Sequence, residues 1–162
     1  MTEPEQHARF LTQSIRLAVE SAQSGRGGPF GAVIVRSDNG QIIGEGANQV
    51  TRTNDPTAHA EIVAIRQACR ALESFSLAGC TLYASCEPCP MCLGAIYWAR
   101  LDHVFFAATR EDAARAGFDD AHIYHEVARP LSERTLPITH LAQSGALAPF
   151  SAWAEQRDRV PY

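Results

Sequence analysis

The sequence contains no lysine, and all fourteen of its basic residues are arginine. This absence excludes reactions that need a lysine Schiff base and the Gly-Lys loop that commonly binds phosphates. The chain also lacks an excess of positive charge, because its formal net charge is -4 at pH 7. Binding of nucleic acid depends on neutralising phosphates, so we expect no nucleic-acid partner. A small neutral substrate fits this charge better.

Long apolar runs are absent as well, and no stretch approaches the ~20 residues of a membrane span. We therefore expect no membrane partner. Residues 1–10 are polar and lack the basic-then-apolar order of a secretion signal, which favours a cytoplasmic protein. The five cysteines are an odd number, which argues against a disulfide framework and for thiolate or metal roles.

The 162 residues, 46% of them hydrophobic, suit a single folded domain over residues 1–162. Sequence patterns predict helices over about 5–24, from Pro88 or Pro90 to about 99, and over 149–159. A further helix is predicted to begin after a cap at Asp55 or Thr57. Another runs from 110 to a break at Gly117, and a weaker helical pattern resumes after Asp120. Strands are predicted over 30–35, 41–47, 80–85, 103–108 and 136–141, with Asp38-Asn39-Gly40 as a hairpin turn. This alternation predicts an α/β domain with a mixed or parallel sheet between helices.

Two short segments supply the ligand types that zinc prefers. His59-Ala60-Glu61 brings an imidazole and a carboxylate, and Pro88-Cys89-Pro90-Met91-Cys92 brings two thiols. We interpret His59, Cys89 and Cys92 as ligands of one zinc ion per chain, with water as the fourth ligand. A site with three protein ligands is typical of catalytic zinc. The metal can lower the pKa of that water to about 7, and Glu61 is the natural proton carrier beside it.

A closed structural zinc site is the main alternative. Cys86 precedes Cys89 by the same spacing that separates Cys89 from Cys92, so three cysteines and His59 could complete a tetrahedron. The chain would then be a zinc-stabilised interaction module. However, Pro88 and Pro90 predict a strand-to-helix turn, and Cys86 falls before that turn, where its sulfur should point elsewhere. We therefore favour the open site.

His59 and Glu61 pose a geometric problem, because residues two positions apart on a regular helix diverge by about 200°. Both can reach one pocket only if the start of the helix itself faces that pocket. A helix start would also stabilise the thiolates of Cys89 and Cys92 through its free backbone N–H groups and its dipole.

With these motifs placed, the chain resembles the cytidine deaminase superfamily. The zinc motifs are shared across that superfamily, whereas Gly117-Phe118-Asp119-Asp120 and the terminal Tyr162 resemble its guanine-type branch. The resemblance implies a cytidine-deaminase-like three-layer α/β/α sandwich around a five-stranded mixed sheet. It also implies a homodimer and the hydrolytic deamination of guanine to xanthine and ammonia in purine metabolism.

The resemblance further implies roles for single residues. Glu61 and Asp120 would be catalytic and would move protons while C2 of the purine is attacked and ammonia leaves. The helix and tail over residues 145–162 would close the active site. The implied substrate contacts are Phe30, Asn48, Ala60, Trp98, Phe118 and Tyr162. Guanosine deamination and tRNA adenosine deamination are the alternative activities, and the acidic net charge speaks against the second.

Overall fold

The computed structural model describes residues 2–118 and 120–162. The chain forms two compact units, residues 1–124 and 125–162, and each is described by itself. The single domain expected over residues 1–162 stays a prediction. Asp119, part of the motif at residues 117–120, lies outside the described residues.

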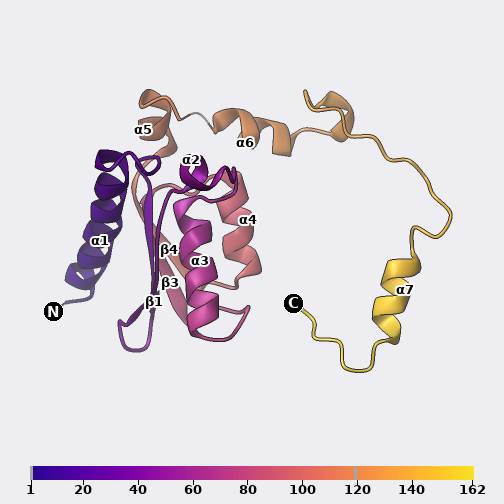
Figure 1. The fold of residues 1–162 in the computed structure, drawn as a ribbon, viewed down its shortest axis with the longest axis horizontal. Helices are drawn as coiled ribbons and strands as arrows, with labels where there is room; N and C mark the ends of the chain where they lie inside the picture. Colours follow the sequence, from indigo (N-terminus) through magenta and orange to yellow (C-terminus); the bar gives the residue numbers. More distant parts are fainter. Residues whose placement is uncertain (1, 119) are drawn as a thin grey trace. The chain divides into compact units, whose positions relative to one another are not determined.

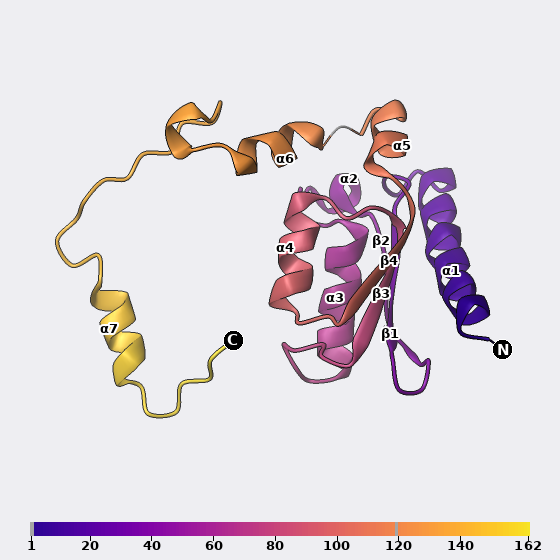
Figure 2. The same cartoon turned by 180° about the vertical axis from the view of Figure 1, so that it is seen from behind.

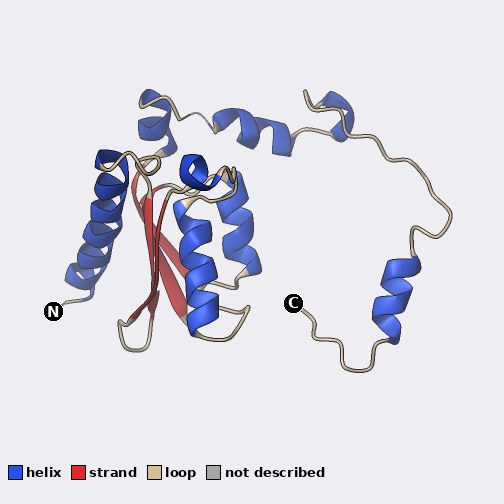
Figure 3. Ribbon diagram, in the orientation of Figure 1, coloured by secondary structure: helices blue, strands red, loops and turns tan. Residues whose placement is uncertain are grey.

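A sheet forms the centre of the first unit (Figure 3). It has four strands, in the order β2-β1-β3-β4. Strand β1 pairs antiparallel with both β2 and β3, whereas β3 pairs parallel with β4. The predicted mixed sheet is therefore confirmed. The strands are β1 (Gly31–Arg36), β2 (Ile42–Ala47), β3 (Cys80–Cys86) and β4 (His103–Ala108).

Helices cover both faces of this sheet, so the predicted three-layer α/β/α arrangement is confirmed. Helix α1 (Glu3–Gln23) lies on one face, and α3 (Ala60–Ala71) and α4 (Pro90–Trp98) lie on the other (Figures 1 and 2). Strand β3 is buried along its whole length. The strand contains no charged residue, which is typical of a strand covered on both faces.

The expectation of a fifth strand is wrong for the residues that the structure describes. Residues 136–141 are irregular and largely exposed. Pro137 lies within this segment and has no backbone N–H to donate to a neighbouring strand. Apolar residues alone therefore do not make this segment part of the sheet.

Three local details between the main elements also differ from the predictions. In the turn between β1 and β2, Gly40 has a positive φ of 71°, whereas Asn39 does not. The N-cap of α3 is His59 rather than Asp55 or Thr57. Asp55 instead accepts hydrogen bonds from the backbone N–H and hydroxyl of Thr57, which closes a local turn before the helix. A short helix α2 (Val50–Thr53), which periodicity did not indicate, precedes that turn.

Gly46 on β2 allows the start of α3 to lie against the sheet. A Cβ atom on this residue would lie 2.1 Å from the carbonyl oxygen of Ala60, the first residue of the helix. No side chain fits in that space. The close contact fixes where His59 and Glu61 stand relative to the strands.

The remaining elements follow the strands. Helix α5 (Arg110–Arg115) begins with a capping box between Thr109 and Asp112. The helical pattern is interrupted at Gly117, whose φ is 90°, as predicted. Then come α6 (Ala121–Ala128), a 3-10 turn (Leu131–Glu133) and α7 (Ala148–Glu155). Within the described part of the chain, no helix is long and apolar enough to cross a membrane.

Candidate active site

Two helix starts bring the candidate zinc ligands together. His59 immediately precedes α3 with an extended backbone, φ -69° and ψ 158°. Cys89 immediately precedes α4 with nearly the same angles, φ -66° and ψ 168°. Because His59 is not helical, it and Glu61 do not diverge as on a regular helix, and both line one cavity. The helix start faces the pocket, as the sequence required.

The three side chains have the spacing that zinc needs. The Sγ atoms of Cys89 and Cys92 each lie 3.5 Å from Nδ1 of His59, and all three potential ligand atoms lie within 4.8 Å of one another. Tetrahedral zinc, with bonds of about 2.3 Å to sulfur and about 2.0–2.1 Å to nitrogen, separates its sulfur and nitrogen ligands by about 3.5 Å. One imidazole and two thiols at these distances fit a zinc ion.

The cluster also favours the metal-binding thiolate form of Cys89. A hydrogen bond from Cys92, followed by one from His59, lowers the pKa of Cys89 to about 4. The pKa of Cys92 is raised, chiefly because its proton is shared with Cys89. The hydrogen bond with Cys89 raises the pKa of His59. A zinc ion would displace these protons, as metal binding to cysteine does generally.

Cys86 is not a member of this three-residue cluster. Its thiol donates to the backbone carbonyl of Thr109 at 3.5 Å, and burial raises the pKa of Cys86 to about 11. The Cys86 thiol therefore contacts a backbone carbonyl and is not among the three ligand atoms that lie within 4.8 Å of one another. The arrangement therefore fits an open site with three protein ligands better than a closed structural site.

Glu61 is a buried carboxyl beside the cluster, with 8% of its surface exposed. Burial is the main reason that its pKa is raised. A raised pKa brings a carboxyl closer to the pH at which it can both give and take a proton, which is the property that a general acid and base needs.

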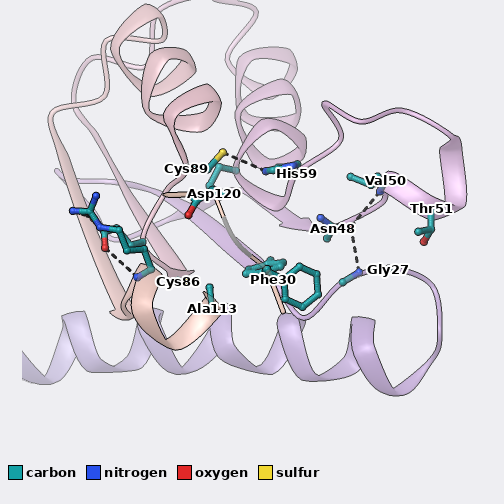
Figure 4. Close-up of a pocket in the computed structure, with 15 residues that line it drawn as sticks. Gly27, Phe30, Asn48, Val50, Thr51, His59, Cys86, Cys89, Ala113 and Asp120 are labelled. Carbon is teal, nitrogen blue, oxygen red and sulfur yellow. Dashed lines mark hydrogen bonds and ion pairs between the residues drawn. The ribbon is translucent and has the colours of Figure 1, made fainter. Parts of the chain in front are cut away.

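A cavity of about 550 Å³ opens in front of the cluster. Its volume lies within the usual range for small-molecule sites. Figure 4 shows His59, Cys89 and Asp120 together in one part of this cavity, with Phe30 and Asn48 on its other walls. The sequence-predicted residues that line it are Phe30, Asn48, His59, Glu61, Cys89, Phe118 and Asp120.

Asn48 has a fixed orientation in the cavity wall. Its Oδ1 atom accepts hydrogen bonds from the backbone N–H groups of Gly28 and Val50, both at 3.2 Å. These two bonds use both acceptor positions of the amide oxygen. The side chain can therefore offer a ligand only the N–H donors of its amide nitrogen.

Aromatic and acidic side chains complete the described lining. The rings of Phe30 and Phe118 meet edge to face, with centroids 4.9 Å apart. Asp120 is half-buried, and burial is the largest reason that its pKa is raised. The cavity thus combines an apolar wall with two carboxyls, Glu61 and Asp120, that hold protons more tightly than in water.

Four predicted residues lie elsewhere. Cys92 is fully buried behind the cavity, and Ala60 is buried in the first turn of α3. Trp98 ends α4 with 63% of its surface exposed, outside the described lining of the cavity. Tyr162 belongs to the second unit and is 73% exposed. The proposed contacts of Ala60, Trp98 and Tyr162 with substrate stay predictions, whereas Cys92 belongs to the ligand cluster.

Glu87 and Arg110 also line the cavity, and the sequence analysis did not single them out. An Nη2 atom of Arg110 lies 3.2 Å from Oε1 of Glu87. Each residue closely follows the end of a strand, and these strands, β3 and β4, are parallel neighbours. Since the carboxyl ends of parallel strands share one edge of a sheet, the position of both residues just after predicted strands was the available signal.

Comparisons with known proteins agree with this site. Residues 4–108 match the family described as the cytidine and deoxycytidylate deaminase zinc-binding region. The chain is 54% identical over 156 residues to a guanine deaminase of Bacillus subtilis, covering 96% of this chain and 99% of that protein. An X-ray structure of the Bacillus subtilis guanine deaminase superimposes with a TM-score of 0.93 at 52% identity and covers 100% of this chain and 99% of the other.

More distant relatives match a smaller share of the chain. A tRNA-specific adenosine deaminase of Aquifex aeolicus is 43% identical over 99 residues, which are 61% of this chain and 64% of that protein. A guanine deaminase structure from Nitrosomonas europaea has a TM-score of 0.65 at 32% identity, covering 68% of this chain and 63% of the other. The zinc-ligand cluster, the fold and the match over residues 4–108 lead to one conclusion: the chain belongs to the cytidine and deoxycytidylate deaminase zinc-binding family.

Proposed function

We propose that this protein hydrolyses the amino group of guanine to give xanthine and ammonia. The observation that carries the proposal is the length of the match to the Bacillus subtilis guanine deaminase, which spans 96% of this chain. It extends beyond residue 108, where the shared zinc-binding region ends, and includes the segment that carries Phe118 and Asp120. The match to the Aquifex aeolicus tRNA-specific adenosine deaminase covers only 61% of this chain.

The orientation of Asn48 supports guanine over adenine. Both acceptor positions of its amide oxygen are occupied by backbone N–H groups, so the side chain offers a substrate only donors. Guanine presents acceptors at O6 and N7, whereas adenine presents an amino group in place of O6. An N–H donor can therefore pair with two acceptors on this edge of guanine, O6 and N7, but with N7 alone on the same edge of adenine.

The residues of the site support the following roles in the reaction. His59, Cys89 and Cys92 would hold zinc, which when bound makes water nucleophilic near neutral pH. Glu61 would take a proton from water and deliver it to a ring nitrogen of guanine, so that C2 becomes electrophilic and forms a bond to the water oxygen before its bond to the amine breaks. Glu61 and Asp120 would then move the remaining protons to the exocyclic amine, because a protonated amine leaves as ammonia. Phe30 and Phe118 would pack against the flat ring and exclude water.

We also propose that the protein works as a homodimer, as its resemblance to the superfamily implies. Helix α4 exposes Leu93 and Trp98, and large apolar side chains exposed together often mark a protein interface. Sedimentation velocity should give the mass of two chains. A single-chain mass at micromolar concentration would contradict this part of the proposal.

A substrate panel tests the activity. Zinc-loaded protein should release ammonia from guanine much faster than from guanosine, adenine, cytosine, cytidine or tRNA. Preference for guanosine would assign the neighbouring nucleoside activity instead. Release from tRNA alone would contradict the proposal, and so would release from none of these substrates.

A further inference from the structure

Tyr124 connects helix α6 to the segment that enters the zinc cluster. Its hydroxyl donates a 2.7 Å hydrogen bond to the carbonyl of Pro88, the residue just before Cys89. Burial raises the pKa of Tyr124, so the hydroxyl keeps the proton that it donates. Residues 121–123 are exposed, whereas the side chain of Tyr124 is half-buried. The first turn of α6 is therefore tied to the zinc segment through this side chain.

Arg110 packs over the ring of Tyr124, and Glu87 holds Arg110 in place. The guanidinium carbon of Arg110 lies 4.6 Å from the centroid of that ring, within the range of a cation–π contact. Glu87 binds Arg110 twice, through the ion pair at 3.2 Å and by accepting the Arg110 backbone N–H at 3.1 Å. Glu87 itself is fixed to β4, because its backbone N–H donates to the carbonyl of Ala108 at 2.9 Å.

Asp120 lies one helical turn before Tyr124. Its backbone carbonyl accepts hydrogen bonds from the N–H groups of Ile123 at 2.9 Å and Tyr124 at 3.2 Å. The position of Asp120 in the cavity therefore follows the position of this first turn. Asp120, Glu87 and Arg110 all line the same cavity.

We propose that Glu87, Arg110 and Tyr124 form a brace that positions Asp120 for proton transfer. The inference rests on the proposed function, because it assigns the brace to the same reaction. Tyr124 is a positioning residue that acts through Asp120, and it has no need to touch the substrate. A small displacement of a proton carrier has a large effect on rate, since proton transfer requires hydrogen-bond distance.

Tyr124→Phe removes the hydroxyl and keeps the ring under Arg110. We expect kcat for guanine to fall about tenfold while KM changes less than twofold. Zinc content and Tm should stay at wild-type values, because the substitution leaves the cluster and the core intact. The matched control is Tyr97→Phe, which removes a hydroxyl from a side chain that is 71% exposed, and it should turn over like wild type.

Two further measurements separate positioning from a general structural role. Amide hydrogen exchange of the zinc-loaded protein should be at least about tenfold faster at Ile123 and Tyr124 in Tyr124→Phe, with no change in α3. In a double-mutant cycle, adding Tyr124→Phe to Asp120→Asn should cost less than twofold in the residual turnover of the Asp120 variant. If Tyr124 acts only through Asp120, substituting Tyr124 has little further effect on turnover once Asp120 has been replaced.

Failure of the brace and failure of the proposed activity give different results. If zinc-loaded wild type fails to deaminate guanine, the proposed function is wrong, and unchanged exchange at Ile123 and Tyr124 would also remove the brace. If wild type is active, the brace is overturned by any of three results: wild-type kcat in Tyr124→Phe, unchanged exchange, or a full tenfold loss added to Asp120→Asn. A loss of zinc together with activity would likewise assign Tyr124 to structure alone.

Discussion

His59 and Cys89 occupy the same position at the starts of two neighbouring helices, and Sγ of Cys89 lies 3.5 Å from Nδ1 of His59. Each residue has an extended backbone immediately before the first helical turn. The side chain therefore leaves from the end of the helix axis rather than from its flank. This shared geometry lets two different segments converge on one metal site.

Glu61→Gln tests the proton carrier. The amide keeps the shape of the side chain and cannot carry a proton, so we expect kcat for guanine to fall by at least about 100-fold. Zinc content, measured by mass spectrometry, and the circular dichroism spectrum should not change. Glu20→Gln, on the exposed face of α1, is a matched control. Near-wild-type kcat in a fully metallated Glu61 variant would remove Glu61 from the mechanism.

The buried carboxyl of Glu61 also predicts that the stability of the zinc-free protein depends on pH, and Glu61→Gln tests this. Burial raises the folded-state pKa of Glu61 above its ordinary value of 4.5, so the folded state binds this proton more tightly than the unfolded chain does. The contribution to stability is complete below pH 4.5 and is lost as pH rises through the folded pKa. The free energy of unfolding, measured with urea, should therefore decline more in wild type than in Glu61→Gln as pH rises above 4.5. Equal declines would contradict the buried, proton-holding state.

The cysteines should differ sharply in their effect on metal content. Cys89→Ser and Cys92→Ser should each lose zinc, whereas Cys86→Ser should stay metallated and active, because Cys86 bonds the Thr109 carbonyl and stands outside the cluster. Cobalt-substituted protein provides an independent measure through its thiolate charge-transfer band. A decrease of about one third in that band in the Cys86 variant would indicate three thiolates and a closed structural site.

Gly46→Ala should disturb the site from a distance. The added Cβ would lie 2.1 Å from the carbonyl oxygen of Ala60, so the start of α3 must move. We expect a loss of about 1–3 kcal/mol in the free energy of unfolding and weaker zinc binding, because His59 moves with Ala60. Gly94→Ala on α4 is the control, since its Cβ meets nothing within 4 Å. Zinc affinity that is equal in both variants would show that the close contact is not needed.

We propose that the tail closes the cavity over the substrate. Residues 145–162 expose several large apolar side chains, namely Leu147, Phe150, Trp153, Val160 and Tyr162. Deleting Pro161 and Tyr162 should lower kcat/KM for guanine at least about tenfold, a loss of about 1.4 kcal/mol of transition-state stabilisation. Zinc content and Tm should remain close to wild type. Unchanged kinetics would mean that the tail has no part in catalysis.

Local patterns predicted much of this protein. Periodicity located α1, α3 and α4, and the ligand types of His59, Cys89 and Cys92 identified the metal site before the fold was known. The cap of α3 was missed because Asp55 and Thr57 are stronger capping residues than histidine, yet they bond to each other. The tertiary structure therefore starts α3 at a residue with a weaker intrinsic preference for the N-cap position.

Contacts between distant segments were the part that the sequence could not reveal. Glu87 and Arg110 meet only because β3 and β4 are parallel neighbours, and strand order is not encoded in the periodicity of either strand. The orientation of Asn48 depends likewise on backbone N–H groups of Gly28 and Val50, which the fold brings to it. Such contacts require the tertiary structure.

A zinc titration of metal-free protein tests the central claim most directly, with conversion of guanine to xanthine followed by ultraviolet absorbance and ammonia release. We predict no conversion without metal and a linear rise in rate that stops at one zinc ion per chain. The Glu61→Gln variant should bind the same single ion and stay inactive. Conversion by metal-free protein, or no conversion by fully zinc-loaded wild type, would contradict zinc-dependent guanine deamination at this site.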